Sequence, residues 1–473
     1  MNAMKDELTN LDATAMAALV AAGEVTALEL VDAAIARVEA RNPALNAVVA
    51  ERFDAARDEA REGSHDGPLA GLPYLIKDLG TDVEGMVTSN GSRLFADAVA
   101  AADSELVVRL RRAGAIVVGK TNTPELGKSP GTEPALFGPS HNPWDLGRSP
   151  GGSSGGAAAA VAGGMLPAAH ASDGGGSIRI PASACGLVGL KPTRGRVPGE
   201  TSRGSAPYPM GVNHAVTRTV RDSAALLDAV AGPTPGMFRL ARPDHPFTDD
   251  VGADPGILRI AVSTTSPLGE AHADCVEATE RAATLCAGLG HDVEEADPGW
   301  EPGYAALALR TYMGASTAYL IERRLEELGR DLADDDIEPF TRQGLEQLEE
   351  VTPVDVIRAE AAMSDAQREM SAFFESFDLA LTPTLTRPPA ELGYLDTADP
   401  VSFGARAGEF AILTAPYNVS GHPAISLPLH WNEEGLPIGV QFGGRYADES
   451  TLIRLAAQLE EAAPWRDRRP PAR

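Results

Sequence analysis

Two tracts of glycine and serine constrain the fold of this 473-residue chain more than any other feature. The first tract, at residues 149–156, reads SPGGSSGG, and the second, at residues 172–181, reads SDGGGSIRIP. Glycine lets the backbone bend sharply and approach a ligand closely. Richness in glycine and serine usually marks a flexible linker, but apolar segments that must pack bound both tracts. The tracts therefore predict two buried bends that carry serine hydroxyls.

The tracts resemble two known motifs only in part. A phosphate-binding loop of the Walker type ends in Gly-Lys followed by Ser or Thr, and neither tract does. Residues 151–155 match the G-x-S-x-G nucleophile elbow of α/β-hydrolases, with Ser153 as nucleophile and His422 or His430 as base. That elbow follows a strand, whereas HNPWDLGRSP precedes this tract. We interpret the match as coincidental and keep an esterase of the α/β-hydrolase type as the alternative.

A serine nucleophile with a lysine base is the remaining interpretation of these serines. Lysine can lose its proton in a protein, whereas arginine cannot. Only five of the 40 basic residues are lysines, and none follows a serine at the spacing of an S-x-x-K pair. Lys77 ends the apolar run GLPYLIK, where a single lysine is usually an edge-strand residue that extends its charge into water. Whether Lys77 is a base therefore depends on the residues that its ammonium contacts in the fold.

Charge and composition exclude several classes of protein. The formal net charge of −27 repels phosphate backbones and anionic membranes, so we expect neither nucleic acid nor membrane as a partner. The sequence contains no long apolar run, and its start, MNAMKDELTN, lacks the pattern of a signal peptide, so we expect a cytoplasmic protein. Three scattered cysteines are too few for a disulfide framework or a zinc site.

Helix and strand patterns alternate along the chain. The segment SELVVRLRRA predicts a helix that ends at Gly114, and AIVVGK at 115–120 predicts a buried strand. A strand, a helix and a second strand follow from residue 257 onward. Three C-terminal segments also read as strands, at 378–385, 424–428 and 439–443. This alternation favours an α/β fold with a covered sheet.

Several further segments resemble the amidase signature family. In that family a GGSSGG tract is followed, 24 residues after its first serine, by GGS within D-x-G-G-S-I-R-x-P; here Ser153 and Ser177 differ by 177 − 153 = 24. The lysine segment matches G-x-P-x-x-x-K-D. Other matching segments are GKTNTPE, NPW, CGLVGLKPT, PYNVSGHPAISLP and GLPIGVQ, and together they extend from about residue 70 to 445.

The resemblance implies the amidase signature fold, an α/β fold in which helices cover both faces of a large, mostly mixed β-sheet. It implies a single domain over residues 1–473. Its expected parts are a helical N-terminal part at about 1–65, a catalytic core at about 66–230, a helical lid or peripheral region at about 300–376, and C-terminal strands and a helix at about 377–465.

The resemblance also implies a Ser–cisSer–Lys triad. Ser177 would be the nucleophile, Ser153 would bridge, preceded by a cis peptide bond at Gly152, and Lys77 would be the base. A lysine accepts a proton only when burial lowers its pKa. No metal or organic cofactor is required.

A turn of backbone amides would form the oxyanion hole of such a site. Asp173 and Arg179 flank this turn, and we expect an ion pair that holds it. His170 is expected to be structural, because the triad needs no imidazole. The amides of the oxyanion hole would be those of Gly174, Gly175, Gly176 and Ser177.

The implied reaction is hydrolysis of a carboxamide through an acyl-enzyme, which gives a carboxylate and an amine. The sequence looks similar to stand-alone bacterial amidases, including the 6-aminohexanoate cyclic-dimer hydrolases that cleave nylon oligomers. We therefore expect cyclic or linear oligoamides, aryl amides or carbamates as small-molecule substrates, and leave a homodimer open. Ile180 stands where the A subunit of tRNA-dependent amidotransferases, a second alternative, usually has Gln. The expected pocket walls are Glu125, Thr132, Tyr312 and Met313.

Overall fold

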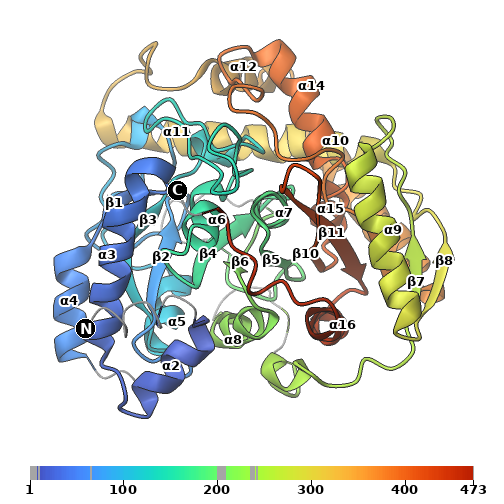
Figure 1. The fold of residues 1–473 in the computed structure, drawn as a ribbon. Coiled ribbons are helices and arrows are strands. Elements are labelled where there is room, and N and C mark those ends of the chain that lie inside the picture. Colours follow the sequence, from blue (N-terminus) through green and yellow to red (C-terminus); the bar gives the residue numbers. More distant parts are fainter. Residues whose placement is uncertain are drawn as a thin grey trace.

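The structure is a computed structural model, and it describes residue 8 and residues 11–63, 66–199, 209–234, 240 and 243–471. An eight-stranded mixed sheet runs through the centre of the molecule (Figure 1). From β4 to β9 each strand is antiparallel to its neighbour, whereas β9, β7 and β8 are parallel. The strand order is β4 (Ala168–Asp173), β6 (Val212–Thr217), β5 (Val188–Lys191), β10 (Ala424–Trp431), β11 (Pro437–Gly444), β9 (Leu379–Pro383), β7 (Arg259–Val262) and β8 (Asp292–Glu295).

A second, three-stranded sheet lies beside the first. Its order is β1 (Val48–Glu51), β3 (Ile116–Thr121) and β2 (Pro73–Lys77), with β2 parallel to β3. β2 lies next to β4 of the large sheet. The amide of Lys77 donates to Nδ1 of His170 on β4 at 3.2 Å, so a side chain links the sheets where no strand ladder does.

Alternating strand residues enter two apolar cores, one on each face. In β4, Ala168 packs into one core and Ala169 into the other. In β3, Val117 packs into the first core, and its neighbours Ile116 and Val118 into the second. Figure 1 shows helices on both faces of the sheets, as the fold class predicted.

Helices α2, α5, α8, α9 and α16 cover the first core, α4, α6 and α7 cover the second, and α3 contributes to both. Their bounds are α2 (Ala13–Ala21), α3 (Ala27–Leu45), α4 (Phe53–Glu62), α5 (Glu105–Arg112), α6 (Gly155–Ala162), α7 (Arg179–Cys185), α8 (Val220–Val230), α9 (Ala273–Gly288) and α16 (Glu449–Ala462).

The expected helical region at about 300–376 is present and lies above the strands in Figure 1. Within the described residues, no helix is long and apolar enough to cross a membrane. This region comprises α10 (Pro302–Ala308), the π-helix η4 (Leu309–Met313), α11 (Gly314–Leu328), α12 (Pro339–Leu348) and α13 (Pro353–Ser376). The remaining helices are α14 (Pro400–Ala411), α15 (Ala415–Ser420), η1 (Arg93–Phe95), η2 (Glu125–Gly127) and η3 (Phe247–Asp250).

Both glycine-serine tracts are packed bends. The first leads into α6, and the second connects β4 to α7. Gly151 has a φ of +79°, and a Cβ there would lie 2.9 Å from Cα of Pro181 in the second tract. The two tracts therefore pack against each other, which excludes a linker.

We expect Gly156→Ala to destabilise the protein. Gly156 lies in α6, where a Cβ would lie 2.5–2.7 Å from backbone atoms of Asn122 and Ala47. Backbone atoms cannot move aside as a flexible side chain can, so the free energy of unfolding should fall by about 1–3 kcal/mol or more. Urea denaturation of both proteins measures the change.

Gly288→Ala is the matched control, because Gly288 ends α9 and nothing lies within 4 Å of its added Cβ. This variant should leave stability unchanged or raise it by about 0.5–1 kcal/mol. Equal stabilities of the two variants would contradict the close packing of α6.

Candidate active site

Lys77 is the last residue of β2 and is fully buried, as are the four residues before it. β2 is an edge strand of the three-stranded sheet, but Lys77 does not extend its charge into water. Its Nζ lies 2.7 Å from Oγ of Ser153 and 3.0 Å from Oγ of Ser172. Burial lowers the pKa of Lys77 to about 7, against an opposing effect of Asp173. Near neutral pH, much of this lysine is therefore uncharged and able to accept a proton.

Ser153 lies at the bend of the first tract, just before α6, and is almost fully buried. The peptide bond between Gly152 and Ser153 is cis, as the resemblance implied. Ser154 fixes the tract to β4, because its Oγ accepts from the amide of Ser172 and donates to the carbonyl of the same residue.

Thr132 holds the first tract from the other side. Its Oγ1 donates to the carbonyl of Gly151 at 2.9 Å and accepts from the amide of Gly155 at 3.2 Å. Thr132 is fully buried and does not line the cavity described below. The expectation that Thr132 forms part of the pocket wall is therefore wrong. Thr132 instead holds the first tract in position.

Asp173 and Arg179 form the expected ion pair, and both side chains are fully buried. Nε and Nη2 of Arg179 donate to the two carboxylate oxygens at 2.9 and 3.0 Å. The same carboxylate accepts from the amides of Gly176 at 2.7 Å and Ile178 at 3.2 Å. The ion pair therefore holds the turn of the second tract.

The other donors of Arg179 are also satisfied. They reach the carbonyl of Thr414, Oε1 of Gln441 and Oδ1 of Asn418 at 2.7–2.9 Å. Burial acts to raise the pKa of Asp173, but Arg179, Lys191 and Asn418 together outweigh it and the pKa falls to about 2. Sequence reasoning missed Asn418 and Gln441, although both lie in the family segments PYNVSGHPAISLP and GLPIGVQ.

The expected set of four oxyanion amides needs one correction. The amide of Gly176 donates to Asp173 and is therefore not directed at a substrate. Gly174, Gly175 and Ser177 line the cavity. Thr414 donates to the carbonyl of Gly175 at 2.6 Å and so fixes the peptide unit between Gly175 and Gly176.

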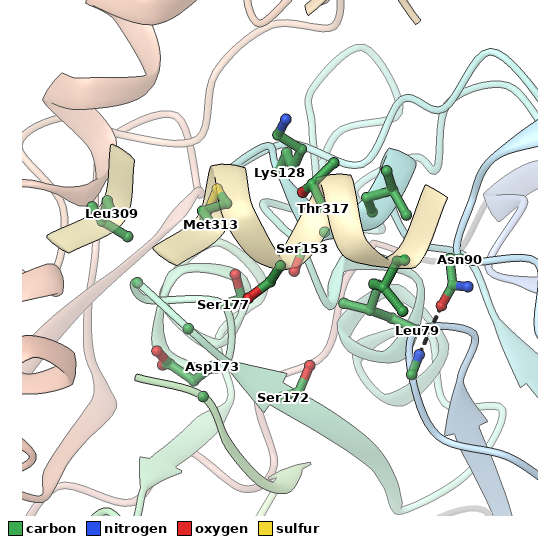
Figure 2. Close-up of a pocket in the computed structure, with 18 of the residues that line it drawn as sticks. Leu79, Asn90, Lys128, Ser153, Ser172, Asp173, Ser177, Leu309, Met313 and Thr317 are labelled. Atoms are coloured by element: carbon green, nitrogen blue, oxygen red, sulfur yellow. Dashed lines mark hydrogen bonds between the residues drawn. The ribbon is translucent and has the colours of Figure 1, made fainter. Parts of the chain in front are cut away.

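Ser153, Ser172 and Ser177 line one cavity of 1320 Å³. Figure 2 shows Ser153 and Ser177 across from the helical segment that carries Leu309, Met313 and Thr317. This segment is η4 followed by α11, so the helical region at about 300–376 supplies the opposite wall.

Of the remaining expected wall residues, Met313 lines the cavity, but Glu125 and Tyr312 do not. The carboxylate of Glu125 accepts from Oγ of Ser92 at 2.7 Å and from the amide of Glu338 at 2.8 Å. Tyr312 packs into a separate apolar cluster, because successive helical residues point in different directions.

His170 is buried between its two ring partners, the amide of Lys77 and Oδ1 of Asn213. Burial lowers the pKa of His170 to about 3, so the ring is neutral. His422 and His430 are absent from the cavity wall, and Ser153 is paired with Lys77 instead. The described residues include no cluster of His, Cys, Asp or Glu that could hold a metal ion.

Comparison with known proteins shows to which family this chain belongs. The Amidase family model matches residues 29–453. The chain is 41% identical to a 6-aminohexanoate-cyclic-dimer hydrolase of Paenarthrobacter ureafaciens, over 97% of this chain and 96% of that protein. It is 36% identical to an acylamidase of Rhodococcus erythropolis, with 97% of each chain covered.

A solved structure of 6-aminohexanoate cyclic dimer hydrolase complexed with substrate superposes with a TM-score of 0.92 at 39% identity, covering 98% of this chain and 99% of that one. Since the family model spans most of the sequence and these relatives align over nearly its full length, the chain belongs to the amidase family, whose members named above hydrolyse amides.

Proposed function

We propose that this chain hydrolyses small-molecule carboxamides with Ser177 as the nucleophile, Ser153 as the proton relay and Lys77 as the general base. The observation that carries the proposal is the contact of 2.7 Å between Nζ of Lys77 and Oγ of Ser153, made on the cavity that Ser177 also lines. A buried lysine with a lowered pKa is the kind of base that activates a serine.

The reaction proceeds in two steps. Oγ of Ser177 attacks the amide carbonyl while its proton passes to Ser153 and the proton of Ser153 passes to Lys77. The relay returns a proton to the departing amine, the C–N bond breaks, and an acyl ester remains on Ser177. Water then attacks this ester by the same route, releases the carboxylate and restores the serine.

The amides of Gly175 and Ser177 are proposed to stabilise the oxyanion of each tetrahedral intermediate. Asp173 supports this role, because it binds the amides of Gly176 and Ile178 and so fixes the direction of the amides between and before them. Fixed donors of this kind need no reorganisation during the reaction.

The proposed substrates are cyclic or linear oligoamides, aryl amides and carbamates. The cavity of 1320 Å³ supports extended substrates, since it exceeds the roughly 300–1000 Å³ of most ligand pockets. Leu79, Phe95 and Leu309 contribute apolar wall for the carbon chains of such molecules. The cytoplasmic location and a homodimer stay predictions.

Ser177→Ala should lower kcat/KM on a panel of 4-nitroanilides by at least about 10³-fold, because the nucleophile is lost. Loss of labelling by a fluorophosphonate probe, measured by intact mass, should accompany the loss of activity. Circular dichroism checks that the variant folds.

The same panel of 4-nitroanilides distinguishes the proposed function from the esterase alternative. That alternative requires His422 or His430, so His430→Gln serves as the control, and its activity should match that of the wild type. Activity that disappears in His430→Gln and survives in Lys77→Ala would contradict the proposed base.

We expect kcat/KM for an uncharged 4-nitroanilide to rise with pH and to reach half its maximum near pH 7. The base must be neutral, so activity is lost as pH falls through the pKa of Lys77, which is about 7. Stopped assays between pH 5 and 9 give the profile.

Lys77→Arg and Lys77→Met should both be inactive over this range, because a guanidinium does not give up its proton and a thioether cannot accept one. A Lys77→Arg variant within tenfold of wild-type activity would show that lysine is not the base.

A further inference from the structure

Lys128 differs from the other described lysines. Lys77, Lys120 and Lys191 are fully buried, and the ammonium of each contacts oxygen acceptors. Lys128 is half-buried, and it makes no hydrogen bond and no ion pair to any residue that the structure describes. Its nearest assigned contact is the ring of Phe340, whose centroid lies 5.3 Å from Nζ.

This unpaired ammonium lines the same cavity as Ser153 and Ser177. Figure 2 shows the Lys128 side chain extending away from Ser153 and Ser177. A substrate amide held at Ser177 would therefore meet Lys128 with a part distant from the reacting bond.

No carboxylate among the residues that the structure describes forms an ion pair with Lys128. Glu125 exerts an attraction on it, but the Glu125 oxygens already accept from Ser92 and from the amide of Glu338. Burial lowers the pKa of Lys128 to about 8 and raises that of Glu125, as expected where neither group compensates the other fully.

The other carboxylates that line the cavity have partners of their own. Asp173 pairs with Arg179, and Glu327 pairs with Arg324. Asp82 accepts from the hydroxyl of Thr88 at 2.8 Å. A molecule bound in the cavity would therefore meet a cation to which none of these carboxylates is assigned.

We propose that Lys128 binds a carboxylate on the substrate, distant from the scissile amide, and so selects amides that carry a free carboxylate, as a linear oligoamide does at one end. The proposal rests on the proposed function and names its substrate class. An ammonium that is partly removed from water without an ion-pair partner is costly, and a carboxylate would supply a hydrogen bond between opposite charges. The cation also offsets locally the repulsion of an anionic substrate by a chain of net charge −27.

The test is a comparison of two matched anilides that release the same product. Adipic acid mono-4-nitroanilide carries a carboxylate on the acyl chain, and N-(4-nitrophenyl)hexanamide is uncharged. We expect the ratio of their kcat/KM values to fall at least about tenfold in Lys128→Met, the size of a lost charged hydrogen bond. Lys128→Arg, which retains the charge, should keep the preference for the acid.

A second pair, 4-hexanamidobenzoate and hexananilide, places the carboxylate on the amine part, and chromatography measures its cleavage. A fall of the ratio by about tenfold in either pair supports the proposal. Unchanged ratios in both pairs overturn it.

Two further variants control the experiment. Gly344→Ala would place a Cβ 2.9 Å from Nζ of Lys128, so it should displace the ammonium and lower the ratio in the same direction while retaining the charge. Arg310→Met removes an exposed cation of the same cavity and should leave the ratio within about threefold of the wild type. An equal fall in Arg310→Met would assign the effect to general electrostatics and overturn the role of Lys128.

Ser177→Ala separates the two proposals. If Ser177→Ala still cleaves N-(4-nitrophenyl)hexanamide, the proposed function fails. If Ser177→Ala is inactive and Lys128→Met leaves both ratios unchanged, only the role of Lys128 fails.

Discussion

The buried ion pair of Asp173 and Arg179 is the interaction on which the site depends. Two charges removed from water are tolerated only when their remaining hydrogen-bonding groups are satisfied. Thr414, Asn418 and Gln441 satisfy the guanidinium, and two amides of the turn satisfy the carboxylate. The three partners of the guanidinium come from α15, from the residue before it and from β11. The C-terminal part of the chain therefore completes a turn that lies more than 200 residues earlier in the sequence. The position of the proposed nucleophile Ser177 therefore depends on the C-terminal part of the chain as well as on its own turn.

The junction of the two sheets is the second constraint. β2 and β4 lie side by side, and the bond from the Lys77 amide to His170 connects them. A neutral imidazole suits this position, because one ring nitrogen accepts this bond and the other can donate to Asn213. The junction also brings Lys77 within reach of Ser153 and Ser172, which belong to the two tracts. The lysine is buried because it lies between sheets.

Local signals in the sequence predicted much of this fold. The segment SELVVRLRRA forms α5, and the apolar run at 115–120 forms the buried strand β3. Family motifs predicted the two serines, the lysine and the cis peptide bond. The sequence could not reveal which partner a polar group takes in three dimensions. Thr132 holds the first tract instead of lining the cavity, the Gly176 amide turns to a carboxylate, and Gln441 reaches Arg179 across the sheet. Periodicity identifies the buried face of an element, but not the element that packs on it.

The wall opposite the serines belongs to a different stretch of chain from the groups around Lys77 and Ser153. Leu309, Met313 and Thr317 follow one another at intervals of four along a single helical segment, and all three line the cavity. None of them takes part in the hydrogen bonds that join Lys77, Ser153 and the turn. Mutations along this row can therefore change the shape of the cavity while the proposed catalytic groups stay in place. The wall that a substrate would face and the groups proposed to act on its amide bond can thus be altered independently of each other.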